Sequence, residues 1–183
     1  MKKTFKFIIT LIFVLIISGC VFKITPQETV EKFLNKYIRN DKEVLKELDL
    51  YLDEQNLTNE QKARYKRIIR DEYSTIKYKI KDETIDGKGA QVEVEIEVKN
   101  LYRAEKEAKD YLITYPKKFY SGEIYDSKKF IDYKLDKMEK ADSSIIYTLY
   151  INLFLENDIW KIEKLDETTL KKIHGIYNYE QLN

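Results

Sequence analysis

The chain has 183 residues, 43% of them hydrophobic and 36% charged, a balance typical of one globular domain rather than a disordered segment. It carries 33 basic and 32 acidic residues, and this near-balance argues against nucleic acid as a partner. One Cys and one His exclude a disulfide framework and a Cys/His zinc site within one chain. We therefore expect no metal and no other cofactor.

The first twenty residues have the three-part layout of a secretory signal. Lys2, Lys3 and Lys6 come first. An apolar run over residues 7–17 follows, and small residues then lead to Cys20. At about 1.5 Å per residue this run spans roughly 16 Å as a helix, short of the ~30 Å hydrocarbon core of a bilayer. The alternative is an uncleaved N-terminal membrane helix with an incidental Cys.

The run Ile17-Ser18-Gly19-Cys20 resembles the bacterial lipobox, in which an aliphatic residue and two small residues precede an obligatory Cys. The resemblance implies cleavage between Gly19 and Cys20 and transfer of diacylglycerol to the Cys20 thiolate. Acyl chains such as palmitate would then hold the mature protein on the extracytoplasmic face of the cell membrane. Removal of residues 1–19 takes away three lysines and no acid, which leaves 30 basic and 32 acidic residues.

We expect three parts in the precursor. Residues 1–19 form the lipoprotein signal peptide, residues 20–24 form the lipidated Cys and a short tether, and residues 25–183 form a single α+β domain. Fully extended, residues 21–24 reach on the order of 15–20 Å. The domain should therefore lie close to the membrane.

Three helix starts are visible near the beginning of this domain. Thr25 and Glu28 have the spacing of a capping box, and Thr58 and Gln61 repeat it. Between them, Asp41 is an N-cap candidate for a second helix. Each start precedes apolar residues at helical spacing, so we expect three helices before the first strand.

The hydrophobic period then changes from that of a helix to that of a strand. Alternation over 76–81 and 92–98, around a glycine-rich turn, predicts an antiparallel pair with lysines facing glutamates on its wet side. Residues 145–155 and 159–162 predict a closing hairpin. We expect helical segments over 101–141 and a last helix over 168–177.

Together these elements predict an α+β fold. N-terminal helices pack on a bent antiparallel sheet of about four strands, with an inserted helical stretch and a C-terminal helix. The opening Thr-Pro-Gln-Glu-Thr-Val-Glu-Lys-Phe at residues 25–33 and the closing Trp160-Lys161-Ile162 resemble small Gram-positive lipoproteins with a nuclear transport factor 2-like (cystatin-like) domain. That resemblance implies a strongly bent sheet that wraps a helix and leaves a cone-shaped pocket, but the fold does not define an activity.

No motif predicts catalysis. The single His174 would have to serve any triad, yet no Gly-x-Ser-x-Gly elbow occurs, and we expect it to have an ordinary role on the surface or at a helix end instead. Asp132 and Asp136 are expected to form ordinary surface pairs with neighbouring lysines on one helix. We therefore expect no catalytic residue and no metal ligand. The acidic face of the second strand, formed by Glu93, Glu95 and Glu97, is expected to be a solvated surface.

Tyrosine is the compositional excess of this chain, with 15 of 183 residues. Tyr111, Tyr115, Tyr120 and Tyr125 fall in the inserted helical stretch and are the candidates for a recognition surface, because Tyr combines a large contact area with a hydroxyl group. The alternative is that these tyrosines cover the rim of a small core.

Our first hypothesis for function is a membrane-anchored binding module that engages an envelope protein or peptide. Its partners would be the membrane, through the diacylglyceryl anchor, and that protein or peptide, with no nucleic acid. One alternative is a cryptic enzyme that uses acidic residues in the cone-shaped pocket. Another is a protective or immunity-type surface lipoprotein.

Overall fold

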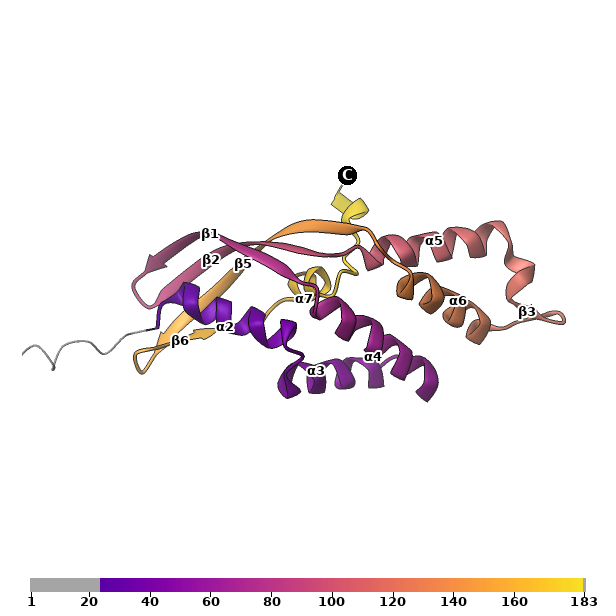
Figure 1. Cartoon of the computed structure of the whole chain (residues 1–183), viewed down its shortest axis with the longest axis horizontal. Coiled ribbons are helices and arrows are strands. Elements are labelled where there is room, and N and C mark those ends of the chain that lie inside the picture. Colours follow the sequence, from indigo (N-terminus) through magenta and orange to yellow (C-terminus); the bar gives the residue numbers. More distant parts are fainter. Residues whose placement is uncertain (1–23, 183) are drawn as a thin grey trace, which may run out of the picture.

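A computed structural model of the chain describes residues 24–182 (Figure 1). The helices are α2 (Pro26–Ile38), α3 (Lys42–Asp53), α4 (Asn59–Tyr73), α5 (Leu101–Thr114), α6 (Ser127–Glu139) and α7 (Glu167–Ile173), with 3₁₀ turns at Pro116–Phe119 and Tyr179–Leu182. The strands β1 (Lys77–Asp86), β2 (Gly89–Lys99), β5 (Ser144–Glu156) and β6 (Ile159–Ile162) form one antiparallel sheet in that order, and β3 (Tyr120–Ser121) pairs with β4 (Ile124–Tyr125). The predicted α+β fold with its four-stranded sheet, inserted helical stretch and C-terminal helix is confirmed.

The N-terminal helices begin at the predicted residues. The Thr25 hydroxyl accepts a hydrogen bond from the backbone N–H of Glu28, whose carboxylate accepts one from the backbone N–H of Thr25, each at 3.1 Å. Thr58 and Gln61 form the same reciprocal pair at the start of α4. Asp41 occupies the N-cap position of α3, but its side chain makes no capping hydrogen bond.

The strand register places opposite charges across the wet face of the sheet, as predicted. Lys77 lies directly opposite Glu97, and their side chains form an ion pair of 3.2 Å. Lys81 pairs with Glu95 at 3.4 Å. The turn between β1 and β2 includes Gly87 with a φ of 58°, in the left-handed region that glycine adopts without strain.

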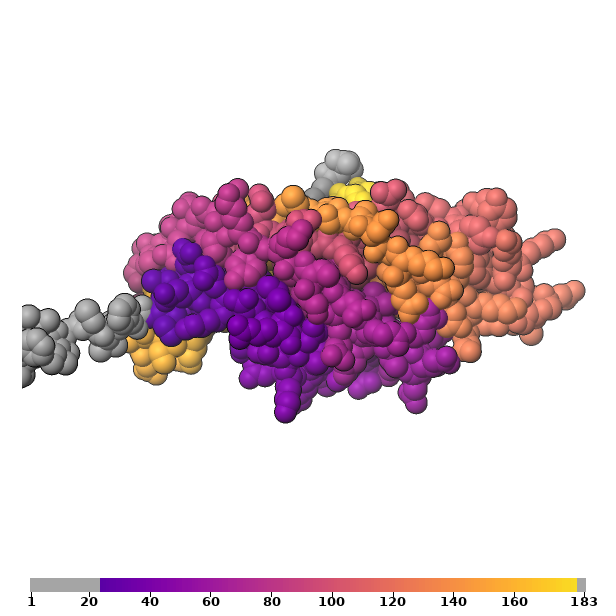
Figure 2. Space-filling view, viewed as in Figure 1, coloured from indigo at the N-terminus to yellow at the C-terminus, as the bar shows by residue number. Residues whose placement is uncertain are grey.

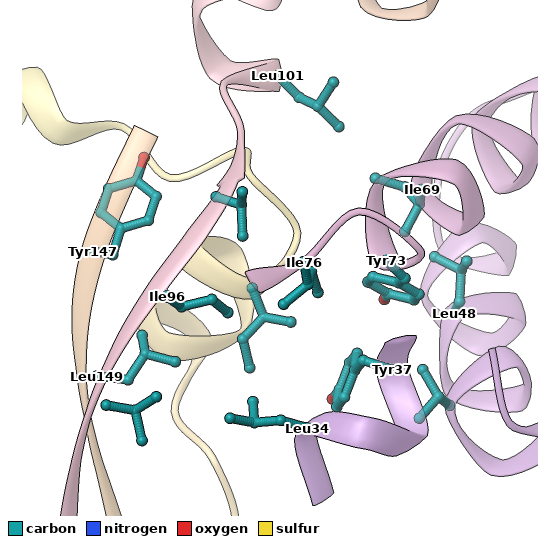
Figure 3. Packing of buried hydrophobic residues seen from close by; sticks show 14 of the residues in the cluster. Leu34, Tyr37, Leu48, Ile69, Tyr73, Ile76, Ile96, Leu101, Tyr147 and Leu149 are labelled. Atoms are coloured by element: carbon teal, nitrogen blue, oxygen red, sulfur yellow. The ribbon is translucent and has the colours of Figure 1, made fainter. Parts of the chain in front are cut away.

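The opposite face of the sheet forms the core. Val92, Val94 and Ile96 on β2 are inaccessible to solvent, and Figure 3 shows Ile96 and Leu149 among the side chains packed beneath the helices. Tyr147 is buried while Tyr150 is exposed, as alternation along one strand requires. The inner face of the sheet at β2 is therefore part of the core.

The last helix is shorter than predicted. It ends at Ile173 rather than 177, with His174 as its C-cap and Gly175 at a φ of 68°. The backbone N–H of Tyr102 donates to the Gly175 carbonyl at 2.8 Å, so a contact with α5 draws the chain out of the helix. The apolar residues after Gly175 therefore continue the hydrophobic pattern without continuing the helix.

The domain is elongated. In Figure 1, α2 begins at the left end of the molecule, beside the β1–β2 turn and β6, while the hairpin of α5 and α6 reaches the right end. The short β3–β4 hairpin caps that right end. The start of the folded chain and the tip of the inserted helices thus lie at opposite poles.

Candidate functional site

The inserted helices α5 and α6 leave the sheet between β2 and β5 and form the candidate recognition surface. Asn100 begins α5, because its side-chain oxygen accepts a 3.0 Å hydrogen bond from the backbone N–H of Arg103. Asp126 begins α6 by accepting hydrogen bonds from the backbone N–H groups of Lys128 and Lys129. Pro116 follows the end of α5.

Polar contacts brace α6 against α4. The side chain of Gln61, which is buried, donates to the Asp132 carboxylate at 2.8 Å. Arg64 contacts Asp136 at 2.5 Å and Glu139 at 2.9 Å. The prediction that the two aspartates pair with lysines on their own helix is therefore wrong. A neighbouring helix presents an amide and a guanidinium group in a geometry that sequence spacing does not reveal.

The end of the hairpin is built around one buried aromatic residue. Phe119, in the 3₁₀ turn, packs edge-on against Phe130 and Tyr133 with ring centroids 5.6 and 5.5 Å apart. Tyr111 stacks on Tyr133 at 4.9 Å and contacts Tyr115 at 4.8 Å. These rings join α5, the turn and α6 into one small core outside the main one.

Apolar side chains project from this aromatic core into solvent. Ile113 on α5 and Ile124 on β4 are 77% and 76% exposed. Isoleucine side chains are usually buried, so two that are this exposed on one hairpin are unusual. Tyr120 and Tyr125 face each other across β3 and β4 at 5.9 Å and remain exposed. Figure 2 shows side chains of this part of the chain projecting from the right-hand end of the molecule.

Two lysines lie among these aromatic residues. The ammonium of Lys118 donates a 2.5 Å hydrogen bond to the Tyr111 hydroxyl and lies 5.2 and 5.5 Å from the ring centroids of Tyr111 and Tyr115. The hydrogen bond to Tyr111 raises the pKa of Lys118. Lys129 donates to the backbone carbonyl of Tyr120 at 2.8 Å. The end of the hairpin thus combines apolar area, hydroxyl groups and positive charge.

We call this surface the tip, defined by residues Ile113, Tyr115, Tyr120, Ile124 and Tyr125 with Lys118. The structure places Tyr115, Tyr120 and Tyr125 of the predicted recognition surface on it and buries part of the fourth, Tyr111, against Tyr133. Sequence reasoning missed the two isoleucines and the β3–β4 hairpin. Gly122, which turns that hairpin at a φ of 67°, was the available signal.

His174 lies far from any catalytic arrangement. Its ring packs 5.7 Å from the ring of Tyr73 and 6.3 Å from that of Tyr51, and burial lowers its pKa to about 4. Within residues 24–182 no hydrogen bond joins it to a Ser or an acid. Of the two roles expected for it, the helix-end position is confirmed by its place as the C-cap of α7, whereas a place on the open surface is wrong, because neighbouring side chains bury the ring.

Glu72 is the one buried acidic side chain in the part of the chain that the structure describes. Burial raises its pKa to about 7, while the backbone N–H of Lys99 partly opposes that rise. Its second oxygen, Oε1, has no hydrogen-bond partner among the described residues. The converging pair of buried carboxylates that the enzyme hypothesis requires is not found between residues 24 and 182, nor is a cluster of metal-ligating side chains.

The predicted lipid attachment at Cys20 and the cleavage site at Gly19 and Cys20 lie outside the described residues. Across residues 24–182, no helix has the length and apolar character needed to cross a bilayer.

Comparison with known proteins gives one distant likeness. No protein-family description and no curated protein matches the chain. Its fold is similar to a Bacillus subtilis structure described as that of a "putative lipoprotein (ycdA)", with a TM-score of 0.42 and 13% sequence identity. The similarity covers 73% of this chain and 44% of that one, so the chain spans less than half the length of this neighbour. That likeness is too distant to carry an assignment of superfamily, and the nuclear transport factor 2-like domain stays a prediction.

Proposed function

We propose that this chain is an extracytoplasmic lipoprotein, anchored through Cys20, that acts as a binding module for a protein or peptide of the cell envelope. Its tip is the contact surface. The lipobox-like run before Cys20 supports the anchor, and the short tether supports a position close to the membrane. We propose no catalytic role for it.

The observation that carries this proposal is the position of the tip relative to the start of the fold. Helix α2 begins six residues after Cys20, and the tip lies at the opposite end of the elongated domain (Figure 1). An anchor at the α2 end would leave the tip at the end of the domain that lies farthest from the anchor. An exposed apolar patch edged by polar groups is typical of a surface that a partner covers.

The composition of the tip favours a protein partner. Aromatic residues with polar hydroxyls contribute binding energy in protein interfaces at a low cost in conformational entropy. Asp126 is already engaged by Ser121 and by the N-terminus of α6, whereas Lys118 and the turn residue Glu123 remain exposed. An envelope protein or peptide that offers apolar residues and carboxylates fits this surface.

The recognition step is tested by photocrosslinking in intact cells. A photoreactive amino acid replaces Tyr120 in the full chain, and Lys46 on α3 is replaced in the matched control. We expect a discrete adduct from position 120 and none of that size from position 46. Absence of a discrete adduct at 120, or the same adduct from both positions, would contradict the proposal.

The anchor is tested separately by metabolic labelling with a fatty acid. Cys20→Ala should abolish labelling and leave an unprocessed precursor, because the thiolate is the acceptor of the lipid. Ser18→Ala keeps a small residue in the lipobox-like run and should be labelled normally. Labelling of the Cys20→Ala variant would show that the anchor lies elsewhere.

A further inference from the structure

A cavity of about 130 Å³ lies between α2, α3, α4 and α7, apart from the tip. Its walls are mainly apolar and aromatic, with Tyr37 and Tyr73 at the deep end, where Figure 3 shows them beside Leu48. The rings of Tyr37 and Tyr73 meet edge to face at 5.1 Å. Tyr51 and His174 line the same space. A cavity of about 150 Å³ is known to accept a benzene-sized guest, so this one is large enough for one compact group.

Three polar side chains stand in the wall of the cavity. Those of Tyr37, Tyr73 and His174 line it, and none of them is among the buried groups left without a hydrogen-bond partner, which in the described residues are Asn40 Oδ1 and Glu72 Oε1. An apolar wall that carries a few polar groups is typical of a small-molecule site. At neutral pH His174 is uncharged, because burial lowers its pKa to about 4.

The mouth of the cavity is negative. Glu167 and Lys171 lie there as an ion pair of 2.7 Å, so their charges compensate. Glu47 lines the same mouth, and no ion pair of the described residues includes it. After burial, the Glu47 carboxylate is the second cause that raises the pKa of the Tyr37 hydroxyl, so its field reaches the deep end. The negative field of the Glu47 carboxylate would disfavour the binding of an anionic ligand.

We propose that this cavity binds a compact organic cation, an ammonium group with small alkyl substituents. The tyrosine rings offer the negative faces of their π-systems to such a group, and Glu47 supplies the compensating charge. A trimethylammonium group is close in size to the benzene-sized guest that such a cavity accepts. Neither the anchor nor the tip contributes to this site, so it is independent of the proposed function.

The single His of the chain makes the test direct. In the full chain, purified in a non-ionic detergent without a histidine tag, the imidazole gives one set of NMR signals, and these come from the cavity wall. Choline chloride is titrated beside 3,3-dimethylbutan-1-ol, which has the same shape without the charge. We expect a saturable shift of the His174 signals with choline, and about tenfold weaker binding of the alcohol.

Two variants assign the preference to residues of the cavity. Glu47→Gln, at an exposed position, should reduce the preference for choline over the alcohol, whereas Glu54→Gln, at the end of the same helix and outside the cavity, should leave the preference intact. Tyr51→Leu should weaken choline binding by removing one ring. Equal affinity of both probes for the unaltered protein, or no saturable shift with choline up to its solubility limit, would overturn the proposal.

Discussion

The carboxylate of Glu72 accepts a 2.9 Å hydrogen bond from the backbone N–H of Lys99, joining the end of α4 to the point where β2 passes into α5. The next residue, Asn100, caps α5 and also donates from its backbone to Ser143 at 2.8 Å. This junction therefore sets the direction in which the inserted hairpin leaves the sheet. Its stability depends on a carboxyl group that is buried with one oxygen unpaired.

Glu72→Gln should change how stability depends on pH. Burial raises the pKa of Glu72 from 4.5 to about 7, so its favourable contribution is complete below pH 4.5 and is lost as pH rises through 7. The loss amounts to roughly 3 kcal/mol between pH 4 and pH 8. Glutamine keeps the acceptor for Lys99 and does not titrate, so urea unfolding of the variant should not show this decline.

Glu93→Gln is the matched control for that measurement, because Glu93 lies on the wet face of β2 rather than in the core. We expect its unfolding free energy to follow the pH dependence of the unaltered protein. A decline of the same size in the Glu72→Gln variant would show that another group causes it.

His174 should make the unfolding free energy depend on pH in the direction opposite to that of Glu72. Burial lowers its pKa from 6.5 to about 4, so the folded protein holds it neutral while the unfolded chain protonates it. Its favourable contribution is complete above pH 6.5 and is lost as pH falls toward 4, by on the order of 3 kcal/mol. In the Glu72→Gln background, unfolding free energy should therefore rise between pH 4 and 6.5.

NMR titration of the imidazole checks the cause directly. A midpoint near pH 4 is expected, because burial of the ring against Tyr51 and Tyr73 disfavours the imidazolium form. A midpoint near 6.5 would mean that the ring is solvated and that the pH effect has another origin.

Gly175→Ala should be strongly destabilising. A Cβ at this position would lie 2.2 Å from the carbonyl oxygen of Lys99, and the φ of 68° is already unfavourable for alanine. We expect a loss of more than about 2 kcal/mol in thermal or urea unfolding. Gly122→Ala is the control with nearly the same φ, 67°, but no atom within 4 Å of its Cβ, and it should cost only about 1 kcal/mol.

The sequence allowed prediction of the elements that depend on neighbouring residues. The capping boxes at Thr25 and Thr58 and the alternation along β2 are local, and the structure has them as expected. The end of α7 was predicted too late because Gly175 leaves the helix through its contacts with Tyr102 and Lys99, more than seventy residues away in the chain. Long-range contacts of this kind leave no trace in hydrophobic periodicity.

The distinction between local and long-range contacts also applies to the tip and to the cavity. The concentration of tyrosine in the inserted stretch indicated the tip, but composition alone did not separate exposed Tyr115 from partly buried Tyr111, because Phe119 decides the packing between them. The cavity beside His174 was not foreseen, since four helices and the chain after α7 supply its walls. Only the folded arrangement brings Tyr37 to residues near the C-terminus.

Finally, the tip should tolerate polar substitutions that abolish recognition. Ile113→Ser with Ile124→Ser removes two side chains that are more than three quarters exposed, so the unfolding free energy should change by less than about 0.5 kcal/mol per substitution. The discrete adduct from position 120 should be lost all the same. Phe119→Ala, which removes a buried ring, should instead cost roughly 3 kcal/mol. A large loss of stability in the double Ser variant would mean that the isoleucines support the fold rather than a partner, and an undiminished adduct would remove them from the contact surface.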